Sequence, residues 1–221
     1  MAYTWGIWKE NIGLEQLIST SEMICFAAKW YGKKDIIFKS VYHHNKKEML
    51  DTVWELLHEA DVVVHYNGRK FDIPTINKDL IKNKFKPPAP FKQVDLIETA
   101  KHTFRFQSNR LEFILRELGL GRKTPHEGFK LWIKCLANDP KAWALMKKYN
   151  INDVVKTEAA YNKLKPWMQS HPRLYESKHD CPYCDSKHVT KHKDRIAIKY
   201  KYTQWQCQSC GKYFSGDRVK K

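Results

Sequence analysis

Hydrophobic and polar positions alternate between strand-like and helix-like spacing along most of the chain. Aromatic and β-branched residues fill three early segments, AYTWGIW, MICFAAKWYG and DIIFKSV, and this predicts strands. From Lys47 to Ala60 apolar residues recur every three or four positions, which predicts an amphipathic helix. The following run, DVVVHYN, is typical of a strand buried on both faces. Strands that later alternate with helices indicate an α/β fold.

The middle of the chain continues the helical pattern. A helix is expected from Ile73 to Phe85, where the prolines of KPPAP end it, and FKQVDLI indicates a strand that runs into a short helix. Asn109 and Glu112 have the spacing of a capping box at the start of the helix LEFILREL. A long helix is expected from about Pro140 to Leu164, because proline suits the first turn of a helix.

Composition changes after Lys165. The stretch WMQSHPRLYESKHD has no clear hydrophobic period and contains a His-Pro pair, which indicates a linker. We therefore predict a globular α/β domain over residues 1–167, a linker over 168–178 and a small module over 179–221.

The small module contains two CxxC pairs, formed by Cys181 with Cys184 and by Cys207 with Cys210. Two such knuckles at the ends of a hairpin make a tetrahedral site of four thiolates, which suits Zn²⁺. A redox motif and a pair of disulfides are the alternatives. Redox motifs come singly on a βαβ unit, and disulfides are rare in cytosolic proteins. The pattern predicts a small β zinc ribbon with structural Zn²⁺, in which residues 186–194 loop out.

Positive charge dominates the composition. Forty Lys and Arg residues face 24 Asp and Glu residues, for a net charge of +16, and such an excess attracts polyanions. In the small module, cations are interleaved with aromatic residues, so that lysines could follow phosphates while rings stack on bases. Alternatively, the rings fill the module's own core and the lysines are solvated. The aromatic residues concerned are Tyr200, Tyr202, Trp205, Tyr213 and Phe214.

Two further features concern location. No apolar run approaches the roughly 18 residues of a membrane-spanning helix. The N-terminal stretch MAYTWGIWKE lacks the basic and apolar regions of a signal peptide. We therefore expect a soluble, cytoplasmic protein without a membrane partner.

Two short segments of the larger domain carry candidate chemistry. The first, NGRKFD, runs from Asn67 to Asp72 directly after the buried strand. The second, YNIND, runs from Tyr149 to Asp153 on the long helix, where a spacing of four places these two residues on one face. From the residues alone, both aspartates could equally be surface acids and the tyrosine a packing residue.

NGRKFD resembles the second motif of DEDD-type 3′–5′ exonucleases, and YNIND resembles their third motif in its tyrosine form. The stretch from about Tyr3 to Trp167 resembles phage and bacterial ribonuclease H-like exonucleases related to the proofreading domain of family B DNA polymerases. The resemblance implies a mixed sheet flanked by helices, and a protein of a prokaryotic cell or a phage-infected host.

The resemblance also implies hydrolysis of phosphodiesters in DNA or RNA with two metal ions. Asp72 and Asp153 would hold Mg²⁺ or Mn²⁺, and Tyr149 would orient the attacking water. Asn67 and Phe71 would contact the substrate, expected to be a single strand or a 3′ end. Replication or recombination proteins are the expected protein partners.

The sequence departs from this family at its first motif, an Asp-x-Glu on the opening strand. No Asp-x-Glu occurs in the 221 residues. In the family this aspartate bridges both metals, so impaired exonuclease activity is expected here. Truncation, a split gene and a binding protein with an inactive nuclease fold all remain open as reasons for the missing motif. Two other functions also remain open: a non-catalytic nucleic-acid-binding protein, and an adaptor whose ribbon docks onto a replication or recombination partner.

Overall fold

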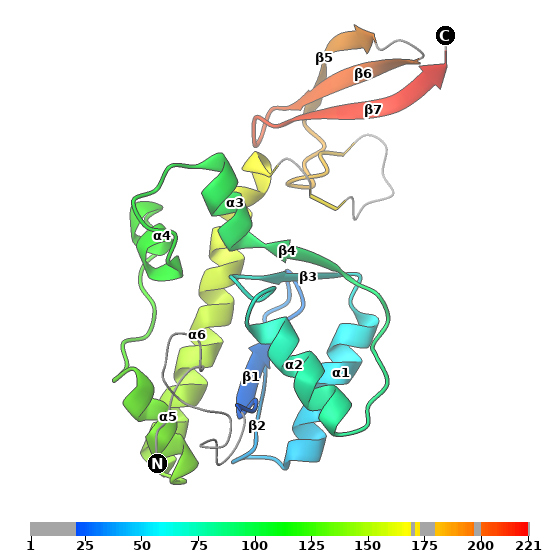
Figure 1. Cartoon of the computed structure of the whole chain (residues 1–221). Coiled ribbons are helices and arrows are strands. Elements are labelled where there is room, and N and C mark those ends of the chain that lie inside the picture. The colour runs from blue at the N-terminus through cyan, green and yellow to red at the C-terminus, as the bar shows by residue number, and fades with distance from the viewer. Residues whose placement is uncertain (1–20, 169–170, 173–179, 197–199, 221) are drawn as a thin grey trace, which may run out of the picture. The chain divides into compact units, whose positions relative to one another are not determined.

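The structure is a computed structural model (Figure 1), and it describes residues 21–168, 171–172, 180–196 and 200–220. These residues group into two compact units, one within Met1–Asp95 and Leu120–Glu158 and the other within Leu96–Gly119 and Ala159–Lys221. The first predicted strand, AYTWGIW, and most of the predicted linker lie outside the described residues. The domain boundaries at residues 167 and 179 therefore stay predictions.

The first unit contains two small sheets. Strands β1 (Cys25–Ala28) and β2 (Ile37–Ser40) pair antiparallel. Strands β3 (Val62–His65) and β4 (Lys92–Asp95) pair in parallel, and the register places His65 opposite Asp95. The carboxyl ends of β3 and β4 therefore lie at the same edge, where polar side chains of the following turns can meet.

Helices pack around these sheets in the same unit (Figure 1). Helix α1 (Lys46–Glu59) begins at Asn45, whose side chain accepts a hydrogen bond from the Glu48 backbone N–H at 2.8 Å. Its apolar stripe is buried, as the spacing predicts. The other helices of this unit are α2 (Asp72–Lys82), α5 (Phe129–Leu136) and α6 (Pro140–Leu164), the last of which continues into the second unit. The long helix is confirmed, whereas the sequence pattern did not predict α5.

The second unit contains the end of α6, the short helices α3 (Leu96–Thr103) and α4 (Leu111–Glu117), and a 3₁₀ turn at Lys165–Trp167. The predicted capping box is wrong, because α4 begins after Arg110, whose backbone N–H is accepted by the Ser108 hydroxyl.

A three-stranded antiparallel sheet in the order β5-β6-β7 completes the second unit. Its strands are Val189–Ile196, Tyr200–Cys207 and Tyr213–Lys220. The predicted loop at residues 186–194 is wrong over most of its length, because backbone pairing with β6 begins at Val189, opposite Cys207.

The described residues thus form a mixed α/β structure with six α-helices, small sheets and a C-terminal antiparallel sheet. A single mixed sheet of the ribonuclease H kind stays a prediction, since its opening strand would lie outside the described residues. Within the described part of the chain, no helix combines the length and apolar character needed to cross a membrane.

Candidate metal and carboxylate sites

Four cysteine sulfurs converge at one end of the C-terminal sheet. The Sγ atoms of Cys181 and Cys210 lie 3.7 Å apart, those of Cys184 and Cys207 lie 3.5 Å apart, and all four lie within 4.8 Å of one another. With Zn–S bonds of about 2.3 Å, a tetrahedron has an edge of about 3.8 Å. Gly211, at φ 74°, supplies the left-handed backbone after the second knuckle. This donor set and its spacing fit structural Zn²⁺.

The aromatic residues of this module divide into two groups. Trp205 and Phe214 pack against the cysteines, so the core-filling alternative holds for these two rings. Tyr200 and Tyr213 are exposed, and Tyr213 also packs edge-on against the His192 ring at 4.9 Å between centroids. The prediction of base stacking therefore depends mainly on the two exposed tyrosines.

A second polar cluster lies at the carboxyl ends of β3 and β4. Asp95 ends β4, is 4% exposed and accepts hydrogen bonds from the backbone N–H groups of Asn67 at 2.6 Å and Arg69 at 3.3 Å. Asn67 has a positive φ of 64°, which turns the chain back toward this carboxylate. Sequence reasoning missed Asp95. The available signal was its place at the end of the predicted strand in FKQVDLI.

Gly68 permits a close approach between this turn and helix α2. A Cβ at Gly68 would lie 2.7 Å from His65 Cγ and 3.0 Å from Asp72 Oδ2. The Gly68 backbone N–H donates to His65 Nδ1 at 3.1 Å, and His65 Nε2 contacts Gln93 Oε1 at 3.1 Å. Asp72 begins α2. Because Gly68 has no side chain, both the His65 ring and the Asp72 carboxylate can lie close to the Gly68 backbone.

Three carboxylates share this electrostatic environment. Asp72 keeps exposed surface, but local burial of its carboxyl group raises its pKa above the usual value. His65 opposes this shift, while the negative charges of Asp95 and Asp153 increase it. The pKa of Asp72 is therefore changed by side chains from three elements, at the ends of β3 and β4 and on helix α6.

Helix α6 contributes Tyr149 and Asp153. Lys123 bridges them, because its Nζ lies 2.7 Å from Asp153 Oδ2 and 3.2 Å from the Tyr149 hydroxyl. Asp153 Oδ1 is buried and has no hydrogen-bond partner among the described residues. Burial raises the pKa of Asp153 above its usual value, although the Lys123 ammonium group opposes the rise. The result is a partly buried carboxylate, with one oxygen paired to an ammonium group and the other buried without a partner among the described residues.

The loop before α5 supplies two residues that sequence reasoning missed. Lys123 is one, and its ammonium group also lies 5.0 Å from the centroid of the Tyr149 ring. The other is His126, whose ring packs edge-on against Tyr149 at 4.6 Å between centroids and whose Nδ1 accepts the Gly128 N–H. Nothing in the pattern of this loop indicated either contact, since both depend on how the loop crosses α6.

The other two predicted residues lie beside this cluster. Phe71, just before α2, is 63% exposed, and Asn67 contributes its backbone N–H to Asp95 as described above. The structure thus places Asn67, Phe71 and Asp72 on one continuous turn and Tyr149 and Asp153 on one helix face. The negative charge of Asp153 helps to raise the pKa of Asp72, and this links the two groups.

The carboxylates have the donor atoms that a divalent cation prefers, but they do not form a cluster of three or more donors among the described residues. Oxygen donors suit Mg²⁺ and Mn²⁺, and an unsatisfied buried carboxylate oxygen is a natural ligand. Among the described residues, however, the four cysteines alone bring three or more donor atoms within 4.8 Å of one another. Lys123 occupies Asp153 Oδ2, which a cation at this carboxylate would also need.

Comparison with known proteins gives the family. No curated protein and no solved structure matches the chain. The model of a family described as the RNase_H superfamily matches residues 10–165, a range that includes both carboxylate segments and Lys123. Proteins of this superfamily bind nucleic acid and typically use divalent metal ions, and membership implies nucleic-acid hydrolysis as the class of activity. Because the match covers more than half of its length, the chain belongs to the RNase H superfamily.

Proposed function

We propose that this chain is a nuclease of the tyrosine DEDD type, which removes nucleotides from 3′ ends of DNA or RNA strands. One observation carries the proposal. In a chain of the RNase H superfamily, Asp153 presents a buried oxygen without a hydrogen-bond partner among the described residues, on the same helix face as Tyr149. The negative charge of Asp153 also raises the pKa of Asp72. Buried acids with raised pKa values mark sites where a cation or proton is handled.

Each residue has a role in this proposal. Asp72 and Asp153 bind the divalent cations, which when bound supply activation of water and stabilisation of the leaving oxygen. The Tyr149 hydroxyl, which accepts a hydrogen bond from Lys123 Nζ at 3.2 Å, orients the attacking water in this proposal. The exposed ring of Phe71 lies next to Asp72, where it can stack on the terminal base, and Asn67 positions the strand end.

The same proposal includes impaired activity for this sequence. It contains no Asp-x-Glu, and two carboxylates cannot hold two cations as four can. Asp95 is a poor replacement, since its two oxygens already accept backbone N–H groups of the turn after β3. We therefore expect trace activity in Mn²⁺ at most.

The test is degradation of end-labelled strands in Mg²⁺ or Mn²⁺, by this chain and by a version with an added N-terminal strand ending in Asp-x-Glu. The added motif should raise the rate by orders of magnitude, because a metal that stabilises the transition state is regained. In that version, Asp153→Asn should abolish turnover, whereas Asp139→Asn, the same change just before α6, should not. Robust Mg²⁺-dependent degradation by the unmodified chain would show that the catalytic acids lie elsewhere.

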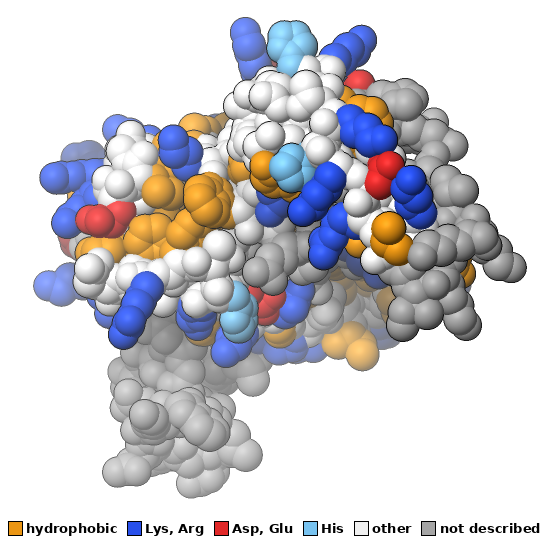
Figure 2. Space-filling view, turned by 90° about the horizontal axis from the view of Figure 1, so that it is seen from above, with side chains coloured by type: hydrophobic (Ala, Val, Ile, Leu, Met, Phe, Trp, Pro, Cys, Tyr) orange, Lys and Arg blue, Asp and Glu red, His pale blue; other side chains and the backbone are white. Residues whose placement is uncertain are grey.

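A non-catalytic nucleic-acid-binding protein is the second candidate. The Lys123–Asp153 ion pair favours it, because an ammonium group already neutralises the carboxylate that a cation would need. Lys and Arg side chains are also spread over the face seen in Figure 2, with few Asp and Glu among them. If the version with the added motif binds strands and cleaves none of them, this second function replaces the first.

The ribbon adds a proposed structural Zn²⁺ and a strand-binding surface. Removing residues 178–221 should weaken binding of single strands if the exposed tyrosines and lysines contact them. Unchanged affinity of the shortened protein would assign the ribbon to another partner, such as a replication or recombination protein.

A further inference from the structure

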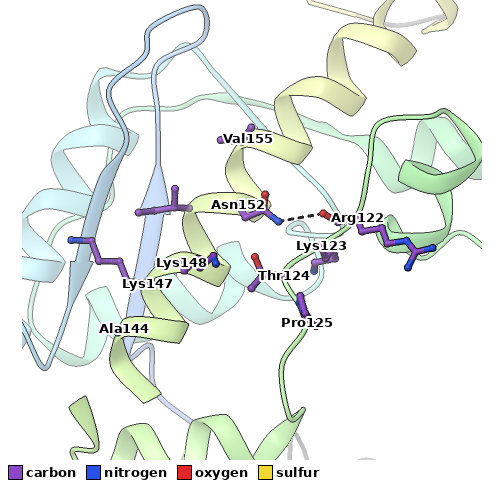
Figure 3. Close-up of a pocket in the computed structure, with 10 residues that line it drawn as sticks. Arg122, Lys123, Thr124, Pro125, Ala144, Lys147, Lys148, Asn152 and Val155 are labelled. Carbon is purple, nitrogen blue, oxygen red and sulfur yellow. Dashed lines mark hydrogen bonds between the residues drawn. The ribbon is translucent and has the colours of Figure 1, made fainter. Parts of the chain in front are cut away.

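A groove lined by cations runs along a face of α6 that differs from the face carrying Tyr149 and Asp153 (Figure 3). It has a volume of about 680 Å³ and is open to solvent. Its polar lining consists of four cations and two uncharged donors, and none of its lining residues is acidic. These six residues are Arg122, Lys123, Thr124, Lys147, Lys148 and Asn152.

The spacing of residues on α6 explains why one helix serves two sites. The groove residues Ala144, Lys148, Ile151 and Val155 recur every three or four positions and so share one stripe. Tyr149 and Asp153, four residues apart, share a different stripe, which faces the carboxylate cluster. One helix therefore presents an acidic site and a basic groove on different faces.

The opposite wall of the groove is a loop fixed to the same helix. Asn152 Nδ2 donates to the Arg122 carbonyl at 3.4 Å, drawn as a dashed line in Figure 3. Lys156 Nζ donates to the Leu120 carbonyl at 2.7 Å, and the Lys123 side chain is held by Asp153. These contacts fix the position of the loop before any ligand arrives, which lowers the entropic cost of binding.

The groove cations have charge available for an anion. Within the described part of the chain, Arg122, Lys147 and Lys148 form no ion pair with a carboxylate, and all three are exposed. Lys147 Nζ lies 5.8 Å from the centroid of the Phe38 ring, a contact that keeps its charge. Of the four cations, Lys123 is the one neutralised, and its partner is the acid of the neighbouring site.

We propose that this groove binds the phosphodiester backbone of a nucleic-acid strand, as a contact separate from the carboxylate site. Cations on two walls of the groove, Lys147 and Lys148 on α6 and Arg122 on the loop, suit a ligand with repeated negative charges. Uncharged Thr124 and Asn152 can donate to phosphate oxygens. The apolar groups of Ile151 and Val155 on the floor suit the sugars between the phosphates. The inference rests on the proposed action on nucleic acid, but it requires binding only and no cleavage.

The test compares two double variants of the full chain, each lacking two positive charges. Arg122→Gln with Lys148→Gln removes two groove cations whose side chains form no ion pair within the described part of the chain. Lys84→Gln with Lys86→Gln is the control, since these lysines are exposed and lie after α2, outside the groove. The affinity for a labelled single strand is measured by fluorescence anisotropy at several salt concentrations.

If the groove holds two phosphates through these cations, the slope of log K against log salt becomes less steep by about 1.4, at about 0.7 for each phosphate contact of a single strand. Binding near physiological salt should weaken by about tenfold. The control should keep the steeper slope of the unmodified chain. Equal slopes for the two double variants would overturn the proposal.

Two further measurements identify the ligand and separate the groove from the carboxylate site. Polyglutamate is used as a competitor of the labelled strand. If the groove double variant loses polyglutamate binding but keeps the strand affinity of the unmodified chain, the groove binds acidic peptides and the proposal is overturned. Asp72→Asn should leave the salt slope unchanged, because Asp72 lies outside the groove and its replacement keeps the Lys123–Asp153 ion pair. If the version with the added Asp-x-Glu motif cleaves no strand while the slope difference is preserved, the proposed nuclease is refuted and the groove proposal stands.

Discussion

Replacing Lys123 by methionine tests whether its ammonium group competes with a divalent cation for Asp153. Methionine keeps much of the aliphatic length but removes the charge, and with it the contacts of 2.7 Å to Asp153 Oδ2 and 3.2 Å to the Tyr149 hydroxyl. Asp153 Oδ2 would then lose its ammonium partner, while Oδ1 already has no hydrogen-bond partner among the described residues. The metal-free protein should become less stable, and its affinity for the cation should rise.

The size of the effect follows from the partial burial of the pair. Both side chains are 25% exposed, so the interaction lies between a solvated surface pair and a buried one. Surface pairs contribute up to about 1 kcal/mol, and breaking a buried pair costs about 3–5 kcal/mol. We expect Lys123→Met to lower the free energy of unfolding by about 1–3 kcal/mol without added divalent cation.

The assay is urea unfolding without and with added Mn²⁺, in buffer free of chelators so that metal at the cysteines is kept. Binding to the folded state stabilises by about 2.7 kcal/mol at a concentration of one hundred times the dissociation constant. In the unmodified chain the cation must first displace Lys123. Mn²⁺ should therefore stabilise the Lys123→Met variant more than the unmodified chain.

Lys134→Met is the matched control. Lys134 pairs with Glu127 at the same distance of 2.7 Å, but these side chains are 47% and 54% exposed. Its replacement should change stability little, because water and salt screen an exposed pair, and should leave the response to Mn²⁺ unchanged. Equal losses for the two variants, or equal responses to Mn²⁺, would refute the idea that Lys123 and a cation share Asp153.

Three other predictions concern single residues. Gly68→Ala should destabilise the protein by about 1–3 kcal/mol in thermal unfolding, because the new Cβ meets the His65 ring at 2.7 Å. Asp72→Asn should raise stability near neutral pH and change it little in acid: the folded-state pKa of Asp72 is raised, so its carboxyl group is accommodated when protonated and costs stability as pH rises through that pKa. A flat difference across urea titrations at several pH values would contradict this. Cys184→Ser should release one zinc per chain, measured by metal analysis, and a freshly purified chain without zinc would refute the site.

Local signals in the sequence were sufficient for most of the helices. The apolar stripe of α1 repeats over several turns, so its burial follows from spacing. Helix α6 was expected from Pro140, which suits a first helical turn. Helix α5 has eight residues, which gives too few repeats for a period to stand out. The predicted helix LEFILREL is present as α4, but its cap is Arg110 and not Asn109, because residues that suit a cap lie at neighbouring positions and spacing alone does not choose among them.

The sequence by itself determined that the four cysteines form one cluster, because the CxxC spacing restricts each pair to a knuckle. Only the way in which the chain pairs the two knuckles was left open. It also placed Tyr149 and Asp153 on one helix face, because four residues make about one turn. Tertiary structure alone decided the surroundings of these side chains. The parallel register of β3 and β4 brings Asp95 to the turn after β3, and a loop crossing α6 places Lys123 on Asp153. Such contacts join residues about thirty positions apart, and neither periodicity nor spacing carries information over that distance.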